Sequence, residues 1–326
     1  MIKKIVRDLY CVNNSCKKAR LNLESFLGTE EECKEGFLSC KICNSRYPII
    51  QGVPILMEDF HKYASQRIII FGKWIVNCRS PEIKSFLKSE GVKIRGHTYN
   101  DRYEENGIWY KSYLNTQNSY HSGDRLLSLF KKQIKPNHIY KMLIDEDLNL
   151  SGIGLDIGCS IGPSTFELSR KLSFVYGIDL SFSFILKARK IMRSRKKRNM
   201  EFIVADATNL PFKSKFFHSI TALNVIDRID FNKLILSINS SLKKNGKLIL
   251  IDPYHFIGDN DKDKFDSNQI RKRLEKFGYK LNNKVSYIPW IMKLNERAYL
   301  FYFVDFIEAK NNLNSFRYKE HKFLSK

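Results

Sequence analysis

Four cysteines near the start of the chain have the spacing of a metal-binding set. Of the seven cysteines in the 326-residue sequence, Cys11 and Cys16 form one close pair, and Cys40 and Cys43 form another. Thiolates in two such pairs are a common ligand set for zinc, whereas an odd cysteine count argues against a disulfide framework. We therefore predict a structural zinc ion held by these four residues, with reduced, unliganded cysteines as the alternative.

A glycine-rich segment at residues 154–164 could hold a ligand against the backbone. Gly158 and Gly162 would let the chain turn sharply between a strand and a helix. The spacing is not the G-x-G-x-x-G of dinucleotide-binding proteins, and Asp156, just before the turn, would repel a phosphate. The segment therefore favours a ligand that carries an ammonium group and lacks a phosphate.

Acidic and amide side chains follow at the ends of later apolar runs. Asp179 lies about 20 residues after the turn, where a carboxylate can accept hydrogen bonds from ribose hydroxyls. Asp206 ends the next apolar run, and Asn224 and Asp227 end the one after that. Because the carboxyl ends of parallel strands meet at one edge of a sheet, we expect these groups to converge beside the glycine turn.

The elements that would position these residues alternate between strands and helices. Apolar runs predict strands at 153–157, 174–178, 201–204, 219–225 and 247–251, with helices at 163–171, 182–195 and 231–243. Such alternation predicts βαβ units and a doubly wound, mostly parallel sheet of the α/β class. A helix at 270–277 and strands at 279–285 and 298–309 follow, and we expect the two strands to form an antiparallel edge.

Residues 150–310 resemble the class I S-adenosylmethionine-dependent methyltransferases. The resemblance rests on the segments 155–162 (LDIGCSIG), 177–179 (GID), 206–212 (DATNLPF) and 242–250 (LKKNGKLIL). It implies a seven-stranded sheet in the order 3-2-1-4-5-7-6 and S-adenosylmethionine as the cofactor. That cofactor carries an amino group and no phosphate, which agrees with the glycine turn.

The same resemblance implies roles for the polar strand ends. Gly158 and Gly162 would line the methionine part of the cofactor, and Asp179 would bind the ribose. Asp206 with Ala207 would bind the adenine, and Asn224 would face the reactive end. The cofactor-binding candidates are Asp156, Gly158, Cys159, Gly162, Asp179, Leu180, Asp206, Ala207 and Asn224.

The sequence specifies the acceptor side less well. Methyltransferases that act on bases or glutamine amides often carry Asn/Asp-Pro-Pro-Tyr/Phe after the fourth strand, whereas this chain has Asn224-Val225-Ile226-Asp227. Residues 224–228 resemble the Asn-Leu-Ile-Asp-Arg stretch of mercaptohistidine N-methyltransferases, which implies a small polar acceptor. We choose His121 and Asp227 as catalytic candidates. The wider group of acceptor-side candidates is Tyr113, Tyr120, Arg228, Tyr254, His255 and Arg297.

Residues 5–58 resemble the small zinc-ribbon family that includes the activator subunit of tRNA and protein methyltransferases. The Cys40–Cys43 knuckle and the segment that follows it to Leu56 carry this resemblance. It implies a zinc-ribbon domain at 1–59. We expect a helical linker or lid at 60–150 and the S-adenosylmethionine-binding domain at 151–326.

The net charge of +22 admits more than one interpretation. Because positive charge attracts nucleic acid, a tRNA or rRNA methyltransferase is an alternative to an enzyme acting on a small-molecule or peptide-borne group. The charge is spread along a chain rich in Lys, Asn and Ile, with one dense cluster at Arg189–Arg198, so we favour a compositional origin. A non-catalytic scaffold whose zinc ribbon recruits a partner is a third hypothesis.

The sequence gives no sign of export or membrane insertion. Its first ten residues carry charges throughout, and no stretch approaches the roughly 20 apolar residues that span a bilayer. We expect a cytoplasmic protein that does not contact a membrane. The sequence leaves its oligomeric state open.

Overall fold

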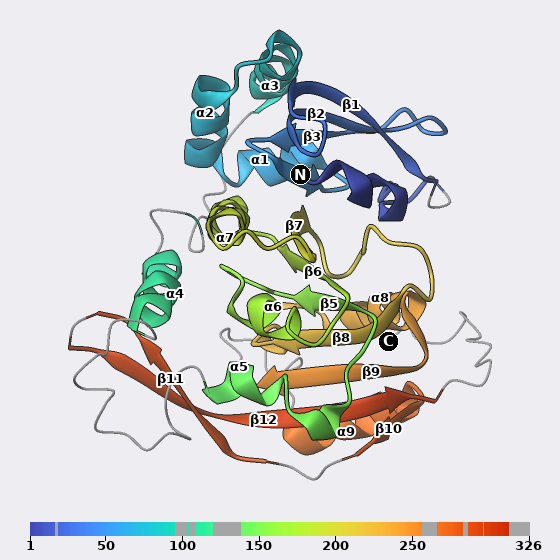
Figure 1. Ribbon diagram of the computed structural model, residues 1–326, viewed down its shortest axis with the longest axis vertical. Coiled ribbons are helices and arrows are strands. Elements are labelled where there is room, and N and C mark those ends of the chain that lie inside the picture. Colours follow the sequence, from blue (N-terminus) through green and yellow to red (C-terminus); the bar gives the residue numbers. More distant parts are fainter. Residues whose placement is uncertain are drawn as a thin grey trace.

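The computed structural model describes residues 1–16, 19–94, 104, 108–119, 138–255, 266–282, 286–295 and 297–312. Tyr120 and the predicted catalytic residue His121 lie outside these ranges. Within them, the strands form one twelve-stranded mixed sheet that runs the length of the molecule (Figure 1). The strand order is β1-β2-β3-β4-β7-β6-β5-β8-β9-β12-β10, and β11 pairs with β12 beside this path.

Five parallel strands form the centre of the sheet. They are β5 (Ile153–Ile157), β6 (Phe174–Asp179), β7 (Met200–Ala205), β8 (Phe217–Leu223) and β9 (Leu242–Asp252). β12 (Tyr299–Asn311) pairs antiparallel with β9, and β10 (Tyr279–Leu281) pairs antiparallel with β12. Because β5 to β8 run in parallel, the polar residues at their carboxyl ends lie along one edge.

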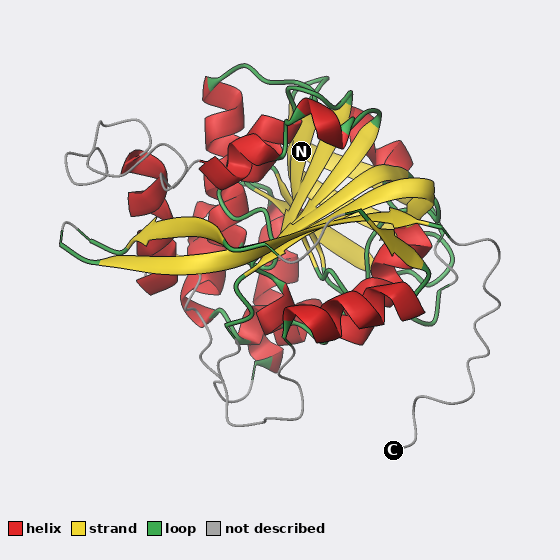
Figure 2. Cartoon of the chain, turned by 90° about the horizontal axis from the view of Figure 1, so that it is seen from below, coloured by secondary structure: helices red, strands yellow, loops and turns green. Residues whose placement is uncertain are grey.

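Helices cover both faces of this sheet, as a doubly wound fold requires (Figure 2). α6 (Pro163–Leu168) and α7 (Phe182–Ser194) pack into the core of one face, and α8 (Phe231–Ser241) and α9 (Ser267–Lys276) into the core of the other. The side chains of Ser181 and Asp230 accept hydrogen bonds from first-turn N–H groups of α7 and α8. These caps explain why both helices begin directly after a polar residue.

The N-terminal segment extends the sheet beyond β7. After a short 3-10 helix, η1 (Lys3–Asp8), come β1 (Leu21–Gly28), β2 (Cys33–Cys40), β3 (Arg46–Ile50) and β4 (Val53–Leu56). These strands pair antiparallel in chain order, and β4 then pairs parallel with β7 through Ile55–Val204 and Leu56–Ala205. The sheet is therefore larger than the seven strands expected, because the N-terminal strands join the β7 edge.

The described residues between β4 and β5 are mostly helical. They form α1 (Phe60–Ser65), α2 (Ile68–Asn77), α3 (Pro81–Lys93), α4 (Ile108–Ser119), α5 (His138–Met142) and the 3-10 helix η4 (Glu146–Leu148). Trp74 of α2 is fully buried, and its ring contacts Phe60, Tyr63, Phe71 and, on α7, Phe182. This aromatic cluster anchors α1 and α2 to the start of α7.

The sequence does not predict β11 (Ile288–Lys293), because its Pro289 argues against a central strand. Proline is tolerated here since, in the described part of the chain, β11 pairs only with β12. The long β11–β12 hairpin reaches α4 (Figure 1), where Lys293 N–H donates to Thr116 Oγ1 at 2.8 Å. As far as the structure describes the chain, none of its helices has both the length and the apolar character that crossing a membrane demands.

Candidate active site

The turn after β5 contains backbone in the left-handed region. Gly158 has a φ of 69° and Ser160 a φ of 50°. A Cβ on Gly158 would lie 2.5 Å from Val225 Cγ2, so a side chain there would have to displace the Val225 side chain. Gly158 lines a cavity at the strand ends. Gly162, with a φ of 96°, does not; its Cβ position faces the ring of Phe202.

Asp156, in β5, holds the turn through hydrogen bonds to α6 and β8. Its carboxylate accepts hydrogen bonds from the hydroxyls of Ser164 at 2.6 Å, Thr165 at 2.5 Å and Thr221 at 3.1 Å. Burial raises the pKa of Asp156 to about 6. Asp156, a predicted cofactor-binding residue, does not line the cavity. Asp156 ties α6 to β5 and β8 and so fixes the turn.

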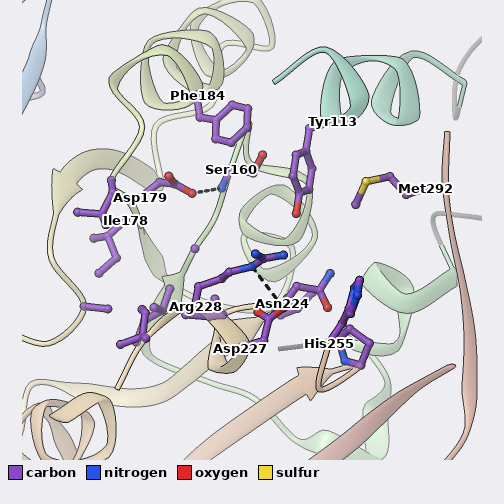
Figure 3. A pocket seen from close by; sticks show the side chains of 18 of the residues that line it. Tyr113, Ser160, Ile178, Asp179, Phe184, Asn224, Asp227, Arg228, His255 and Met292 are labelled. Atoms are coloured by element: carbon purple, nitrogen blue, oxygen red, sulfur yellow. Dashed lines mark hydrogen bonds and ion pairs between the residues drawn. The ribbon is translucent and has the colours of Figure 1, made fainter. Parts of the chain in front are cut away.

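Asp179 ends β6 at the wall of the cavity. Its carboxylate accepts a hydrogen bond from the backbone N–H of Ser160 at 2.9 Å (Figure 3) and another from the backbone N–H of Ser181 at 2.8 Å. Burial is the main cause that raises the pKa of Asp179 to about 6. Each carboxylate oxygen offers about two acceptor positions, so Asp179 can also accept from hydroxyl groups of a ligand.

The end of β7 borders two adjoining cavities. Ala207 and Leu180 line the same cavity as Asp179. The Asp206 carboxylate accepts from the backbone N–H and the hydroxyl of Thr208, both at 2.8 Å. Asp206 lines a second cavity, which it shares with Leu180 and with residues of the N-terminal segment. Asp179 and Asp206 therefore lie on neighbouring cavities rather than on a single one.

Cys159 lies within the turn and is 1% exposed. Burial raises the pKa of its thiol well above the ordinary value. A thiol that stays protonated at neutral pH is a poor nucleophile. Cys159 contributes to the lining of a small pocket next to the main cavity, together with Gly158 and Asn224.

Four buried polar atoms of residues that line the main cavity have no hydrogen-bond partner among the described residues. Three are oxygens, Ser160 Oγ, Asn224 Oδ1 and Asp227 Oδ1, and the fourth is Trp290 Nε1. Asn224 is held in a left-handed conformation with a φ of 53°, and its N–H donates to Ile251 O at 2.8 Å. Because a buried polar atom without a partner is costly, this arrangement favours a ligand that supplies amino or hydroxyl groups.

Aromatic side chains form the opposite wall of the cavity. Trp290 from β11 and Tyr302 from β12 stack with their ring centroids 5.7 Å apart. The rings of Tyr113 from α4 and Phe184 from α7 form a T-shaped pair with their centroids 5.4 Å apart. Met292 lies beside them (Figure 3). Of these five, only Tyr113 is predicted from the sequence. The others have no local signal, because their approach depends on how β11, β12 and α7 pack.

Asp227, Arg228 and His255 meet at the cavity, whereas two other acceptor-side candidates do not reach it. Asp227 Oδ2 lies 3.3 Å from Arg228 Nε. Burial raises the pKa of Asp227, and the charges of Arg228 and His255 oppose this rise. Tyr254 instead donates its hydroxyl to Asp305, and Arg297 does not line the cavity.

The four predicted metal ligands form a cluster in the N-terminal segment. The Sγ atoms of Cys11, Cys16, Cys40 and Cys43 lie within 4.8 Å of one another, and the Cys11–Cys43 and Cys16–Cys40 distances are both 3.5 Å. Thiolates at about 2.3 Å from a tetrahedral zinc ion would be about 3.8 Å apart. The thiol of Cys33 lies outside this cluster and donates to Glu35 O at 3.4 Å. The donor set thus fits one zinc ion.

Comparison with known proteins identifies the central part of the chain. Residues 155–250 match the family model described as a methyltransferase domain. The chain is 28% identical over 148 residues to an uncharacterized protein of Methanocaldococcus jannaschii, covering 43% of this chain and 61% of the relative. It is 29% identical over 112 residues to the demethylmenaquinone methyltransferase of Lactococcus lactis, covering 33% of this chain and 44% of the relative.

A solved S-adenosylmethionine-dependent methyltransferase from Aquifex aeolicus aligns with 57% of this chain and 98% of its own, with 16% identity and a TM-score of 0.43. The chain spans less than two thirds of the length of the two curated relatives. The match to the methyltransferase-domain family is confined to residues 155–250.

Proposed function

We propose that the chain transfers a methyl group from S-adenosylmethionine to a small-molecule or peptide-borne acceptor in a biosynthetic reaction. One observation carries this proposal. The buried, unpartnered oxygens of Ser160, Asn224 and Asp227 meet the carboxylate of Asp179 in a cavity whose other half is aromatic. A polar half and an apolar half side by side suit a cofactor and a small acceptor.

The residues at the strand ends would hold the cofactor, which supplies an electrophilic methyl group when bound. Asp179 would accept hydrogen bonds from the ribose hydroxyls, and Ala207 would pack against the adenine. Asp206 would accept from the adenine amino group from the side of the adjoining cavity. The Gly158 backbone and Asn224 would lie along the methionine part.

Asp227 and His255 would act on the acceptor. Methyl transfer is an in-line displacement, so the protein must align the acceptor and exclude water. The rings of Trp290 and Tyr302 would exclude water, and the free oxygen of Asp227 would accept a proton or hydrogen bond from the acceptor. The raised pKa of Asp227 brings this carboxyl closer to the working pH of a general base.

Calorimetry with S-adenosylmethionine tests the cofactor part of the proposal. The wild-type chain should bind one molecule, and Asp179→Asn should bind at least about tenfold more weakly, because hydrogen bonds to a charged group are lost. Asp147→Asn, at an exposed site, is the matched control and should bind as the wild type does. Transfer of label from the cofactor to a fraction of cell extract would then identify the acceptor. A folded wild-type chain that binds no cofactor would refute the proposal.

We also propose that the four clustered cysteines bind a structural zinc ion. Elemental analysis should find one zinc per chain in the wild type and none in Cys40→Ser. Cys33→Ser, which changes a buried cysteine outside the cluster, should keep the metal. Equal zinc content in all three proteins would contradict the assignment.

The ion pairs of α7 favour a small acceptor over RNA. Arg189 pairs with Glu201 and Glu32, and Arg193 pairs with Glu32 at 2.8 Å. Of the seven basic residues in this cluster, Arg189, Arg193 and Arg198 thus contact acidic residues of the protein, and none of the seven lines the cavity. If RNA were nevertheless the substrate, its binding would weaken steeply with salt.

A further inference from the structure

Glu104 is buried against the start of α7, although it lies far outside the methyltransferase domain in sequence. Its side chain is 2% exposed. One carboxylate oxygen accepts from Phe182 N–H at 3.2 Å, and the other accepts from Ser183 N–H at 3.0 Å and from the Ser181 hydroxyl at 3.3 Å. First-turn N–H groups have no partner within their own helix, and the helix dipole favours a negative charge there. Glu104 therefore caps α7 from a distant part of the chain.

The same turn holds Asp179. The Ser181 N–H donates to Asp179, and the Ser181 hydroxyl accepts from Phe184 N–H at 3.1 Å. The four consecutive N–H groups from Ser181 to Phe184 are thus shared among Asp179, Glu104 and the Ser181 hydroxyl. The orientation of the Asp179 carboxylate depends on the position of Ser181, which Glu104 fixes.

Arg67, at the start of α2, balances the charge of Glu104. Its Nε lies 3.0 Å from the Glu104 carboxylate, and its guanidinium lies over the ring of Tyr63 at 4.1 Å. The Tyr63 hydroxyl donates to Leu180 O at 2.8 Å. Tyr63 of α1 therefore contacts the backbone of the residue that follows Asp179, and Arg67 reaches the same turn through Glu104.

We propose that Glu104, held by Arg67, is a positioning residue that sets the orientation and the electrostatic environment of the ribose-binding carboxylate of Asp179. The inference rests on the proposed function, because it takes Asp179 as a ligand of the cofactor. Glu104 does not line the cavity, so any effect of its substitution on cofactor binding must pass through other groups.

The charges around Asp179 make this role measurable. After burial, Glu104 is the group that raises the pKa of Asp179 most, and Arg67 lowers it. Cys159 and Tyr63 also face Asp179, but burial raises the pKa of both, so they stay neutral at physiological pH. Glu104 and Arg67 are therefore the charges to change.

The test is the affinity for S-adenosylmethionine, measured by calorimetry on the full chain from about pH 5 to pH 8.5. Protonation of Asp179 should weaken binding below about pH 6 in the wild type. Glu104→Gln should bind about tenfold more weakly at high pH, because a buried hydrogen-bonded charge is lost. The midpoint pH, at which the affinity of this variant falls to half of its high-pH value, should be lower than in the wild type, because the negative charge of Glu104 no longer repels that of Asp179.

Arg67→Met should shift the same midpoint in the opposite direction, because it leaves the charge of Glu104 unbalanced. Asp156 also titrates near pH 6, but its partners are unchanged in both variants, so it cannot produce opposite shifts. Glu90→Gln is the matched control: it removes a carboxylate of α3 that pairs with Lys93, and it should behave as the wild type.

Thermal melting establishes that each variant is folded. If only one of Glu104→Gln and Arg67→Met folds, the direction of its midpoint shift alone tests the positioning role. Wild-type affinity and an unshifted midpoint in the folded variants would overturn the positioning role. A folded wild-type chain that binds no cofactor would instead refute the proposed function.

Discussion

At the residue scale, the site separates groups that face a ligand from groups that hold those groups in place. Asp179 has both carboxylate oxygens on backbone N–H groups and still borders the cavity. The carboxylate oxygens of Asp156 instead accept hydrogen bonds from three hydroxyl groups, and Asp156 does not border the cavity. A carboxylate near a strand end can thus serve either purpose, depending on the donors that the next helix brings to it.

The two glycines of the turn should respond differently to substitution. Gly162→Ala should destabilise the fold by about 1–3 kcal/mol, because a left-handed residue gains a Cβ against two buried rings. Gly158→Ala should in addition weaken cofactor binding, since Gly158 lines the cavity and Gly162 does not. Urea unfolding and calorimetry on both variants check this prediction. Equal loss of cofactor affinity in the two variants would contradict it.

Asp227 should affect turnover rather than cofactor binding. Asp227→Asn should lower kcat about 10²-fold or more, as expected for loss of a general base, and leave the affinity for S-adenosylmethionine unchanged. Because the pKa of Asp227 is raised, wild-type activity should fall on acidification as this carboxylate takes up a proton. The variant should lack this acidic limb. A pH–rate profile of labelled methyl transfer gives the result, and an unchanged limb would exclude the role.

At the element scale, the β11–β12 hairpin and α4 together form the aromatic wall of the cavity. Asn115 on α4 donates to Leu294 O at 2.8 Å, and Thr116 accepts from Lys293 N–H. α4 also reaches α7, where Tyr110 stacks on Phe184 at 5.4 Å. α4 therefore links the β11–β12 hairpin to α7.

Substitutions on the two faces of this hairpin should separate acceptor binding from stability. Trp290→Ala should raise KM for the acceptor and leave cofactor affinity near the wild-type value, because Trp290 lines the aromatic half of the cavity. Phe301→Ala, on a side chain that is 47% exposed, is the control and should change neither. Steady-state kinetics with the identified acceptor would show the difference. Equal KM values for both variants would mean that the acceptor binds elsewhere.

Sequence periodicity predicts the central strands and helices, but it does not predict the aromatic wall of the cavity. The apolar run at 153–157 coincides with β5, because a parallel strand buried on both faces is mostly apolar. β11 contains Pro289 and is stabilised by pairing with β12 and by contact with α4. Such long-range contacts leave no periodic trace, so Trp290 and Met292 could not be assigned to the site beforehand.

At the scale of the whole molecule, buried charges join the N-terminal segment to the methyltransferase domain. Arg189 on α7 and Glu201 on β7 are both fully buried and form an ion pair. Glu201 also accepts from Ile2 N–H at 2.6 Å. The sequence shows Arg189 only as part of a basic cluster, because Glu32 lies far away in the sequence and Glu201, on the next strand, meets it only after the sheet has formed.

Replacing one partner of this ion pair should lower the free energy of unfolding more than replacing both partners does. Arg189→Met should destabilise the fold by about 3–5 kcal/mol, because Glu201 would be left as a buried charge without its partner. The double variant Arg189→Met/Glu201→Gln should recover much of that loss. Urea unfolding of the single and double variants measures the difference. A double variant less stable than Arg189→Met would contradict this prediction.

The parallel pairing of β4 with β7 has a consequence for any shortened form of the chain. A protein lacking the first 59 residues would present the backbone of β7 as an open edge, with buried apolar side chains on both of its faces. Uncovered edges of this kind recruit strands from other molecules. Such a fragment would tend to self-associate and aggregate, even though it retains every strand of the methyltransferase domain.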